Sequence, residues 1–261
     1  MNILVCLKMV SRATYTDMLC ADDASDDRLS GGAIEINPAD AYALETALKL
    51  KDRYGAYVTV LSMSPMLAEP MLRSALAMGA DEAVLVCDRI FAGSDTIATA
   101  KTLSAALKAL PRQDMIFCGS KAIDSETGHI GAQLAALNEL RYMGDVLAVN
   151  ELRGGRLCVK HAGKHGAEEY SLVLPAVFSI INGTGMIRSP TIFGLRSSAK
   201  REIRIMTGDT LHLTAEQAGK NASGTETVRI DRLSFAHRHG AYTDDVHDGA
   251  AGLAEMLECA K

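Results

Sequence analysis

The sequence predicts an α/β protein built on an open, mostly parallel sheet with helices on both faces. Two observations lead to this fold class. Short apolar runs that suit buried strands recur along the first two hundred residues, and amphipathic segments of helical length separate them. Strands that alternate with helices of roughly 10–15 residues form right-handed crossover units, and such units assemble into a parallel sheet.

The expected strands are continuous apolar stretches, as a sheet covered on both faces requires. They comprise residues 3–7, 57–61, 83–87, 115–118 and 174–181. In the last of them Pro175 lies near the start, where no hydrogen bond of the sheet is lost. The expected helices comprise residues 38–53, 66–78, 95–110, 126–140 and 249–259.

The ends of the first two helices carry recognisable signals. Asn37 precedes Pro38, so we expect the Asn37 side chain to cap a helix whose first position suits proline. Asp40 places a negative charge near the positive end of the helix dipole. Gly79 follows an Ala-Leu-Ala-Met run and is expected to end the second helix.

After residue 143 the pattern changes to glycine-separated strands and a polar tail. Two short strand-like pieces predict a β-hairpin, and the Gly/Ser/Thr-rich stretch from 207 to 227 predicts an extended arm. We therefore expect one α/β domain over residues 1–205, with a hairpin insertion near 150–172. Residues 206–261 are expected to form the arm and a C-terminal helix.

The composition excludes several functional classes. With 27 basic and 32 acidic residues the net charge is −5, which argues against a nucleic-acid surface. No apolar run reaches the roughly 18 residues of a membrane-spanning helix, and the first residues lack the features of a secretory signal. The six cysteines form no CxxC pair, which favours a reduced, cytoplasmic protein without a zinc site. Aromatic residues make up 5% of the chain, so we expect backbone and small polar groups to hold any ligand.

Residues 114–131 form the most informative stretch for function. A buried strand runs into a Gly/Ser-rich loop and then into a helix, at what should be the carboxyl end of a parallel strand. Ligands of open α/β sheets bind there, and backbone N–H groups at a helix N-terminus favour phosphate or pyrophosphate. An ordinary connecting loop, with glycine for the turn and Ser/Thr as caps, is the alternative that these residues leave open.

Catalytic motifs are absent from the sequence. GxxxxGK[ST], GxSxG and HExxH do not occur, and no GxGxxG follows the first strand. The histidines between residues 161 and 247 lack a metal-ligand spacing, and His129 suits a cap or a surface position. We therefore expect no catalytic residue and no metal site.

Four sequence blocks follow one another in a characteristic order. They are residues 3–8 (Ile-Leu-Val-Cys-Leu-Lys), 36–45 (Ile-Asn-Pro-Ala-Asp-Ala-Tyr-Ala-Leu-Glu), 74–83 (Ser-Ala-Leu-Ala-Met-Gly-Ala-Asp-Glu-Ala), and 119–131 followed by Leu-Pro-Ala-Val at 174–177. In this order they resemble the β subunit of electron transfer flavoproteins along the whole chain. The resemblance implies a sheet like that of adenine-nucleotide α-hydrolases, in an electron carrier that is not itself an enzyme. The segment after Lys8 departs from the family because it lacks the usual Val-Pro-Asp.

The resemblance also implies an adenine nucleotide bound to this chain. Cys6, Asn37, Pro38, Asp40 and Met63 would line its adenosine end. Its phosphates would lie among the residues of one continuous segment, namely Gly119, Ser120, Lys121, Ala122, Ile123, Asp124, Ser125, Glu126, Thr127, Gly128, His129, Ile130, Gly131, Ala132 and Gln133. In the ordinary branch of the family this ligand is AMP, whereas in the bifurcating branch a second FAD takes its place and splits an electron pair.

One segment favours FAD over AMP. Residues 122–131, Ala-Ile-Asp-Ser-Glu-Thr-Gly-His-Ile-Gly, are similar to the bifurcating pattern Ala-Ile-Asp-Gly-Asp-Thr-Ala-Gln-Val-Gly. Ser125 and Gly128 depart from that pattern, and Ala132 stands where that branch often has proline. The sequence therefore favours FAD, with AMP as the alternative ligand.

The implied partners are a flavin-bearing α subunit and an acyl-CoA or other flavin dehydrogenase. The arm and the C-terminal helix would pack on the α subunit. Residues 182–200 correspond to the dehydrogenase-recognition segment, in which Ile192 and Phe193 would be apolar anchors and Arg188 and Arg196 would belong to the polar rim. The alternative is a simple amphipathic helix with Ile192 in the core.

Two other functions remain as alternatives on the same sheet. One is an adenine-nucleotide hydrolase or an ATP-using ligase, which the missing phosphate-activating motif disfavours. The other is a stress-type nucleotide-binding module that forms homodimers, which the long polar arm and the C-terminal helix disfavour.

Overall fold

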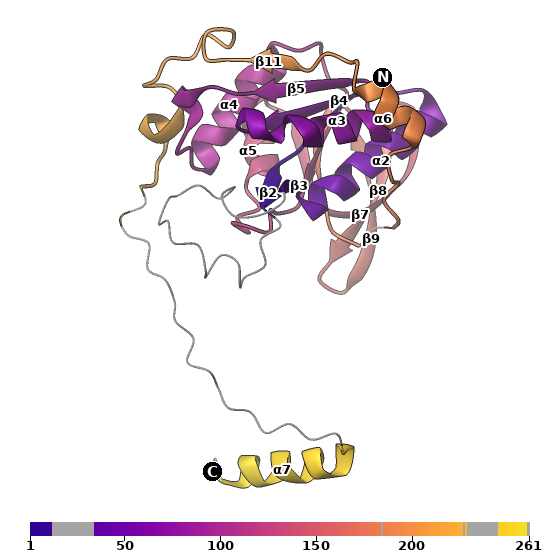
Figure 1. Cartoon of the computed structure of the whole chain (residues 1–261). Coiled ribbons are helices and arrows are strands. Elements are labelled where there is room, and N and C mark those ends of the chain that lie inside the picture. Colours follow the sequence, from indigo (N-terminus) through magenta and orange to yellow (C-terminus); the bar gives the residue numbers. More distant parts are fainter. Residues whose placement is uncertain (12–33, 184, 227, 229–244, 260–261) are drawn as a thin grey trace. The chain divides into compact units, whose positions relative to one another are not determined.

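The computed structural model describes residues 1–11, 34–183, 185–226, 228 and 245–259. The chain divides into two compact units, Met1–Val228 and Arg229–Lys261. The first unit contains a sheet of nine strands, which is drawn in Figure 1. Its strands are β1 (Asn2–Cys6), β4 (Tyr57–Met63), β5 (Glu82–Val86), β6 (Met115–Gly119), β7 (Arg141–Arg153), β8 (Arg156–Gly163), β9 (Gly166–Val173), β10 (Ala176–Ile180) and β11 (Arg204–Met206).

The strand order in this sheet is β11-β5-β4-β1-β6-β10-β7-β8-β9. Every pair from β11 to β7 is parallel, and only the pairs β7–β8 and β8–β9 are antiparallel. The predicted open, mostly parallel sheet is therefore confirmed. The predicted hairpin is the β8–β9 pair at one edge of this sheet.

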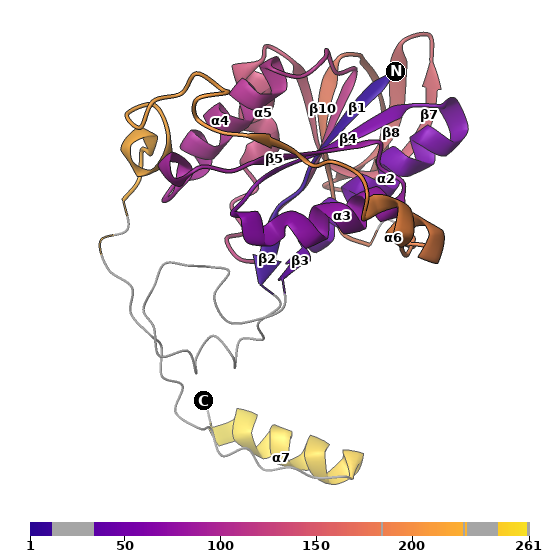
Figure 2. The ribbon, with the colours of Figure 1, turned by 45° about the horizontal axis from the view of Figure 1, so that its top comes forward.

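Helices cover both faces of the sheet, as Figure 2 shows. Ile3 and Val5 of β1 belong to one apolar cluster with residues of α2 and α3, whereas Leu4 and Cys6 belong to a second cluster with residues of α4 and α5. Because side chains alternate along a strand, one short strand contributes to both cores. The helices are α2 (Pro38–Tyr54), α3 (Glu69–Met78), α4 (Thr96–Lys108), α5 (Ile130–Leu137) and α6 (Ile192–Ser198), with 3-10 turns η1 (Met66–Ala68), η2 (Arg89–Phe91) and η3 (Gly219–Ala222).

Some elements differ from the sequence-based expectation. The helix expected from residue 126 begins only at Ile130, because Glu126 (φ 50°) and Gly128 (φ 65°) adopt left-handed backbone conformations. An antiparallel pair, β2 (Met9–Ser11) with β3 (Ile34–Ile36), was not expected. By contrast, Gly79 ends α3 as predicted, with its φ at 126°.

The described part of the polar segment after β11 packs on the sheet domain and does not extend away from it. The Gly208 N–H donates to Asp88 Oδ2 at 2.9 Å, and the Gly224 N–H donates to Asp95 Oδ2 at 2.7 Å. Leu211 and Ala218 are buried. The first compact unit extends to Val228. Part of the expected arm, residues 227 and 229–244, lies outside the described residues.

The second compact unit contains the helix α7 (Val246–Cys259), which confirms the helix expected at 249–259 and begins three residues earlier. Its apolar side chains Val246, Leu253 and Leu257 are exposed. Within the described parts of the chain, no helix combines the length and the apolar character needed to cross a membrane.

Candidate functional site

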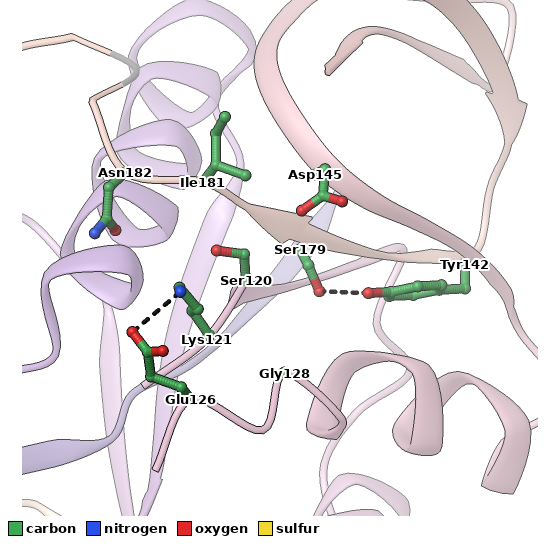
Figure 3. A pocket seen from close by; sticks show the side chains of 9 residues that line it. All are labelled: Ser120, Lys121, Glu126, Gly128, Tyr142, Asp145, Ser179, Ile181 and Asn182. Atoms are coloured by element: carbon green, nitrogen blue, oxygen red, sulfur yellow. Dashed lines mark hydrogen bonds and ion pairs between the residues drawn. The ribbon is translucent and has the colours of Figure 1, made fainter. Parts of the chain in front are cut away.

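The candidate site lies at the edge of the sheet where the parallel strands end. Strand β6 ends at Gly119, and the loop of residues 120–129 connects it to α5. Beside this loop is a pocket of about 490 Å³. Its lining, drawn in Figure 3, consists of Ser120, Lys121, Glu126, Gly128, Tyr142, Asp145, Ser179, Ile181 and Asn182.

The lining combines predicted residues with residues that sequence reasoning missed. The predicted loop supplies Ser120, Lys121, Glu126 and Gly128. The other five residues come from β7 and from the end of β10. Polar residues follow the buried strand β10, just as they follow β6. This signal, which pointed to the β6 loop, could also have identified the pocket residues at the end of β10. No sequence signal marked Tyr142 or Asp145.

Small residues let the elements around this pocket approach one another closely. A Cβ on Gly131 would lie 2.5 Å from Ser179 Oγ and 3.1 Å from Tyr142 Cε2. The Tyr142 hydroxyl and Ser179 Oγ are hydrogen-bonded at 2.9 Å, and burial raises the pKa of Tyr142. Glycine at position 131 therefore allows the first turn of α5 to pack against β7 and β10.

The start of α5 has backbone N–H groups available to a ligand. His129 occupies the N-cap position, but its side chain makes no capping hydrogen bond among the described residues. The first N–H groups of a helix have no partner within the helix and carry the positive end of its dipole. Lys121 Nζ lies 3.0 Å from Glu126 Oε1 in the same lining (Figure 3). An uncapped helix start of this kind suits an anionic ligand group.

Asn37 has a different role from the one expected. Its side chain makes no capping hydrogen bond to α2. Instead, Asn37 Nδ2 donates to the Lys121 carbonyl at 3.0 Å, and the Ile123 N–H donates to Asn37 Oδ1 at 3.1 Å. The side chain thus bonds to the backbone of the site loop, more than eighty residues away in the sequence.

Asp40 also bonds to backbone near the loop. Its Oδ2 accepts from the Lys8 N–H at 2.7 Å, and its Oδ1 accepts from the Gly119 N–H at 2.8 Å. Burial raises the pKa of Asp40 to about 6, although these two hydrogen bonds and that of Asn37 favour the charged form. Lys8 Nζ in turn pairs with Asp124 Oδ1 at 2.6 Å.

The other predicted adenosine-end residues do not line the pocket. Cys6 is buried at the end of β1, and a hydrogen bond between its free thiol and that of Cys118, together with burial, raises the pKa of Cys118. Met63 ends β4, and Pro38 is the first residue of α2. The pocket lining contains none of these residues, nor Asn37 or Asp40.

The remaining loop residues lie at or near the surface. Ile123, Asp124, Thr127, His129 and Ala132 are exposed, and Ala122, Ser125 and Ile130 are half-buried. Gln133 Nε2 lies 3.4 Å from Thr96 Oγ1, and its buried Oε1 has no hydrogen-bond partner among the described residues. That oxygen is available to accept a hydrogen bond from water or a ligand.

The predicted partner segment, residues 182–200, contains the short helix α6. Ile192 and Phe193 are 88% and 82% exposed, so the alternative that placed Ile192 in the core is wrong. Gly194 packs against the Ala77 carbonyl so closely that a Cβ would clash with it. Arg196 is exposed, as expected of a polar rim.

Arg188 does not extend freely from this segment. Its Nε lies 2.9 Å from Glu45 Oε2, and its Nη2 lies 2.7 Å from Asp52 Oδ2, both on α2. The Glu45 side chain is 7% exposed and the Arg188 side chain 30%. Arg188 therefore fastens the start of the partner segment to the sheet domain.

Replacing Arg188 with methionine is expected to lower the free energy of unfolding by about 1–2 kcal/mol, because Glu45 would lose its buried charge partner. Urea denaturation followed by circular dichroism measures the change. The matched control is Arg196→Met on the exposed face of α6, for which we expect a change within about 0.5 kcal/mol. Equal effects of the two substitutions would contradict a fastening role for Arg188.

No group of three or more His, Cys, Asp or Glu side chains within the described ranges could hold a metal ion. The geometry thus defines an α/β protein with a polar pocket at the carboxyl edge of a parallel sheet. The same domain also carries α6, whose apolar side chains Ile192 and Phe193 are exposed.

Comparisons with known proteins place this architecture in a family. Residues 30–203 match the electron transfer flavoprotein domain. The chain is 36% identical over 259 residues to electron transfer flavoprotein subunit beta of Thermoanaerobacterium thermosaccharolyticum, with 98% of each chain covered. It is 36% identical over 262 residues to the same subunit of Clostridium acetobutylicum, covering 99% of this chain and 98% of that one. It is 34% identical over 234 residues to the caffeyl-CoA reductase-Etf complex subunit CarD of Acetobacterium woodii, covering 88% and 87%.

This chain belongs to the electron transfer flavoprotein family, as a β subunit. The resemblance inferred from the four sequence blocks is thereby confirmed. As a family member the chain is an electron-carrier subunit of a flavoprotein.

Proposed function

We propose that this chain binds FAD in the pocket beside the β6–α5 loop and forms a heterodimeric electron carrier with a flavin-bearing α subunit. One observation supports the nucleotide site above the others. Lys121 and Gly128 line a pocket of about 490 Å³, and the loop that carries them runs directly into the uncapped start of α5. Main-chain N–H groups at a helix start, together with a lysine, suit the pyrophosphate of a dinucleotide.

The residues of this chain bind and orient the nucleotide. The first N–H groups of α5 would hold a phosphate, and Lys121 would offset part of its charge. The unpartnered Gln133 Oε1 would accept a hydrogen bond from the ligand or from its hydration shell. A flavin, when bound, supplies the redox chemistry, while the protein supplies its position and its electrostatic surroundings.

The choice of FAD over AMP rests on two lines of support. Residues 122–131 share the Ala-Ile-Asp, acidic-Thr and Gly positions of the bifurcating pattern. The pocket also continues past the loop to Tyr142, Asp145 and Asn182, which leaves space beyond a phosphate group. On this proposal the complex takes part in flavin-based electron bifurcation.

Analysis of bound nucleotide tests the proposal. The α and β subunits are co-expressed, the purified complex is denatured, and the released nucleotides are separated and quantified. We expect about two FAD per heterodimer. One FAD with one AMP would overturn the assignment of FAD to the β chain, and a complex without any nucleotide on this chain would overturn the site itself.

Two surfaces are assigned to partners under the same proposal. The exposed Ile192 and Phe193 on α6 would contact a flavin dehydrogenase. The exposed apolar side chains of α7 would pack on the α subunit, because a helix in isolation cannot bury such a stripe. The described cysteines 6, 87, 118 and 158 are free thiols, which is in keeping with a reducing compartment.

A further inference from the structure

We propose that Arg73 and Arg201 are positioning residues of the partner-binding surface, which hold α6 on α3 so that Ile192 and Phe193 meet a dehydrogenase in one fixed orientation. This inference rests on the proposed docking of a flavin dehydrogenase at α6 and deepens it. It also gives a role to residues 74–83, one of the four blocks of family resemblance, none of which lines the pocket.

The helix α6 is too short to be ordered by its own hydrogen bonds. It has seven residues, and isolated helices of fewer than about 12 residues are marginal in water. Of these residues only Ser198 is buried, so the helix adds little to the core of the domain. Both ribbon views show α6 beside α3 (Figures 1 and 2), and contacts with that helix must therefore supply its order.

The Arg73 guanidinium, on α3, holds the C-terminal end of α6. Its Nη1 donates to the Ser198 carbonyl at 2.9 Å and to the Arg201 carbonyl at 3.0 Å. Glu69, one turn earlier on α3, accepts from Nε and Nη2 at 2.9 and 2.6 Å and so orients the guanidinium plane. The last carbonyls of a helix lack partners within it, and the helix dipole favours a cation there.

Arg201 makes the reciprocal contact, from the residues after α6 to the residues after α3. Its Nη1 donates to the Ala80 carbonyl at 2.8 Å, and its Nη2 donates to the Asp81 carbonyl. The Asp81 side chain is itself held, because its carboxylate accepts from the Val58 N–H at 2.9 Å and pairs with Lys51 Nζ at 2.6 Å. The end of the 74–83 block is therefore a firm support for Arg201.

Gly194 brings the two helices into direct contact. A Cβ at this position would clash with the Ala77 carbonyl oxygen, so glycine is needed for α6 to rest on α3 here. At the start of α6 the Gly194 N–H donates to Thr191 Oγ1 at 2.9 Å, which caps the helix. Ile192 and Phe193 follow this cap directly, and the helix that carries them is fixed at its start, its middle and its end.

Loss of either arginine contact should leave the apolar anchors Ile192 and Phe193 present but less well ordered. A surface that is ordered before binding loses less conformational entropy when the partner binds. Both guanidinium groups bond to carbonyls of this chain, so neither needs to touch the dehydrogenase. The effect of each arginine on docking therefore acts through the two anchors.

The experiment measures the KM of an acyl-CoA dehydrogenase for the full heterodimer. Arg73→Met keeps most of the apolar stem, and we expect it to raise the KM at least about fivefold. In the Ile192→Ser/Phe193→Ser background the same substitution should change the KM by less than about twofold, because no anchor is left to position. A further fivefold rise in that background would mean direct contact with the dehydrogenase and would overturn the positioning role.

Arg201→Met is the second variant, and Arg156→Met is the matched control. Arg201→Met removes the reciprocal contact and should also raise the KM, which keeps the role testable if the Arg73→Met heterodimer does not assemble. Arg156 likewise donates to a backbone carbonyl, that of Ser171 at 2.8 Å, but it lies in the hairpin at the sheet edge opposite β11. Its substitution should leave the KM within about twofold of the wild-type value.

Amide hydrogen exchange of the heterodimer without dehydrogenase separates positioning from direct contact. The Leu195 and Ala199 amides donate to the carbonyls of Thr191 and Leu195 at 2.9 and 3.2 Å. In Arg73→Met both amides should exchange at least about tenfold faster than in the wild type, whereas a residue that only touched the dehydrogenase would leave them unchanged.

The outcomes distinguish the positioning role from the proposed docking surface. A raised KM in Ile192→Ser/Phe193→Ser, with wild-type KM and wild-type amide exchange in Arg73→Met, would overturn the positioning role alone. An unchanged KM in Ile192→Ser/Phe193→Ser would overturn the docking surface itself, and the positioning role with it.

Discussion

The Gly119→Ala variant is expected to lose about 3 kcal/mol or more of unfolding free energy and to bind no nucleotide on this chain. A Cβ at position 119 would lie 2.7 Å from Ala39 Cβ and 2.8 Å from the Ala39 carbonyl carbon, and would clash with Asp40 Oδ1. Because all three atoms belong to the first turn of α2, and two of them are the Cβ and the backbone of Ala39, they cannot move aside without shifting the helix. Urea denaturation and FAD titration measure the two effects.

Gly224→Ala is the control for this substitution. Gly224 also has an ordinary backbone conformation, but a Cβ there would lie 3.7 Å from Asp95 and 3.8 Å from Ile97, which is normal contact. We expect its stability to change by less than about 1 kcal/mol. If Gly119→Ala proved as stable as Gly224→Ala, the close approach of α2 to the end of β6 would be incorrect.

The second large effect concerns the apolar surface of α6. The double variant Ile192→Ser/Phe193→Ser is expected to raise the KM of an acyl-CoA dehydrogenase for the heterodimer at least about thirtyfold, corresponding to about 2 kcal/mol. Both side chains are more than four-fifths exposed, so their removal should not disturb the core. Flavin content and thermal stability of the complex should remain those of the wild type.

Leu137→Ser serves as the comparison for the α6 variant. Leu137 is also an exposed apolar residue, but it ends α5 in the helix layer on the other face of the sheet (Figure 2). Its substitution should leave the KM within about twofold of the wild-type value. An unchanged KM in the α6 variant would remove this surface from the dehydrogenase interface.

The contacts that hold α6 on the domain explain why a large rise in KM is expected for the α6 variant. Arg73 on α3 donates to the carbonyls of Ser198 and Arg201, and Arg201 donates to those of Ala80 and Asp81. Gly194 packs directly on Ala77. A surface that is already ordered loses less conformational entropy on binding, so more of its contact energy appears as affinity.

Strand β7 contains pocket residues that the sequence alone did not predict. Of its 13 residues only Val146 is buried, because beyond its parallel pairing with β10 the strand continues into the hairpin sheet. The apolar period that predicts a buried strand is therefore weak there. Tyr142 and Asp145, which line the pocket, lie in this strand and were missed for that reason.

Asn37 and Asp40 show a second limit of prediction from the sequence, which concerns the partners of buried polar side chains. Local rules correctly placed a helix start at Pro38, and they assigned both side chains to that helix start. Their actual partners are Lys8, Gly119, Lys121 and Ile123, which approach only when β1 and β6 become neighbours in the sheet. Side chains of this kind take whichever backbone partner the tertiary fold provides.

The sequence by itself determined the fold class and the family, and it predicted the loop after β6 as the place for a ligand. These properties follow from local apolar periodicity and from the order of sequence blocks, which require no knowledge of distant contacts. Only the tertiary structure decided which residues line the pocket, which backbone groups Asn37 and Asp40 bind, and that Ile192 and Phe193 are exposed. Each of these depends on burial and hydrogen bonding between segments that lie far apart in the chain.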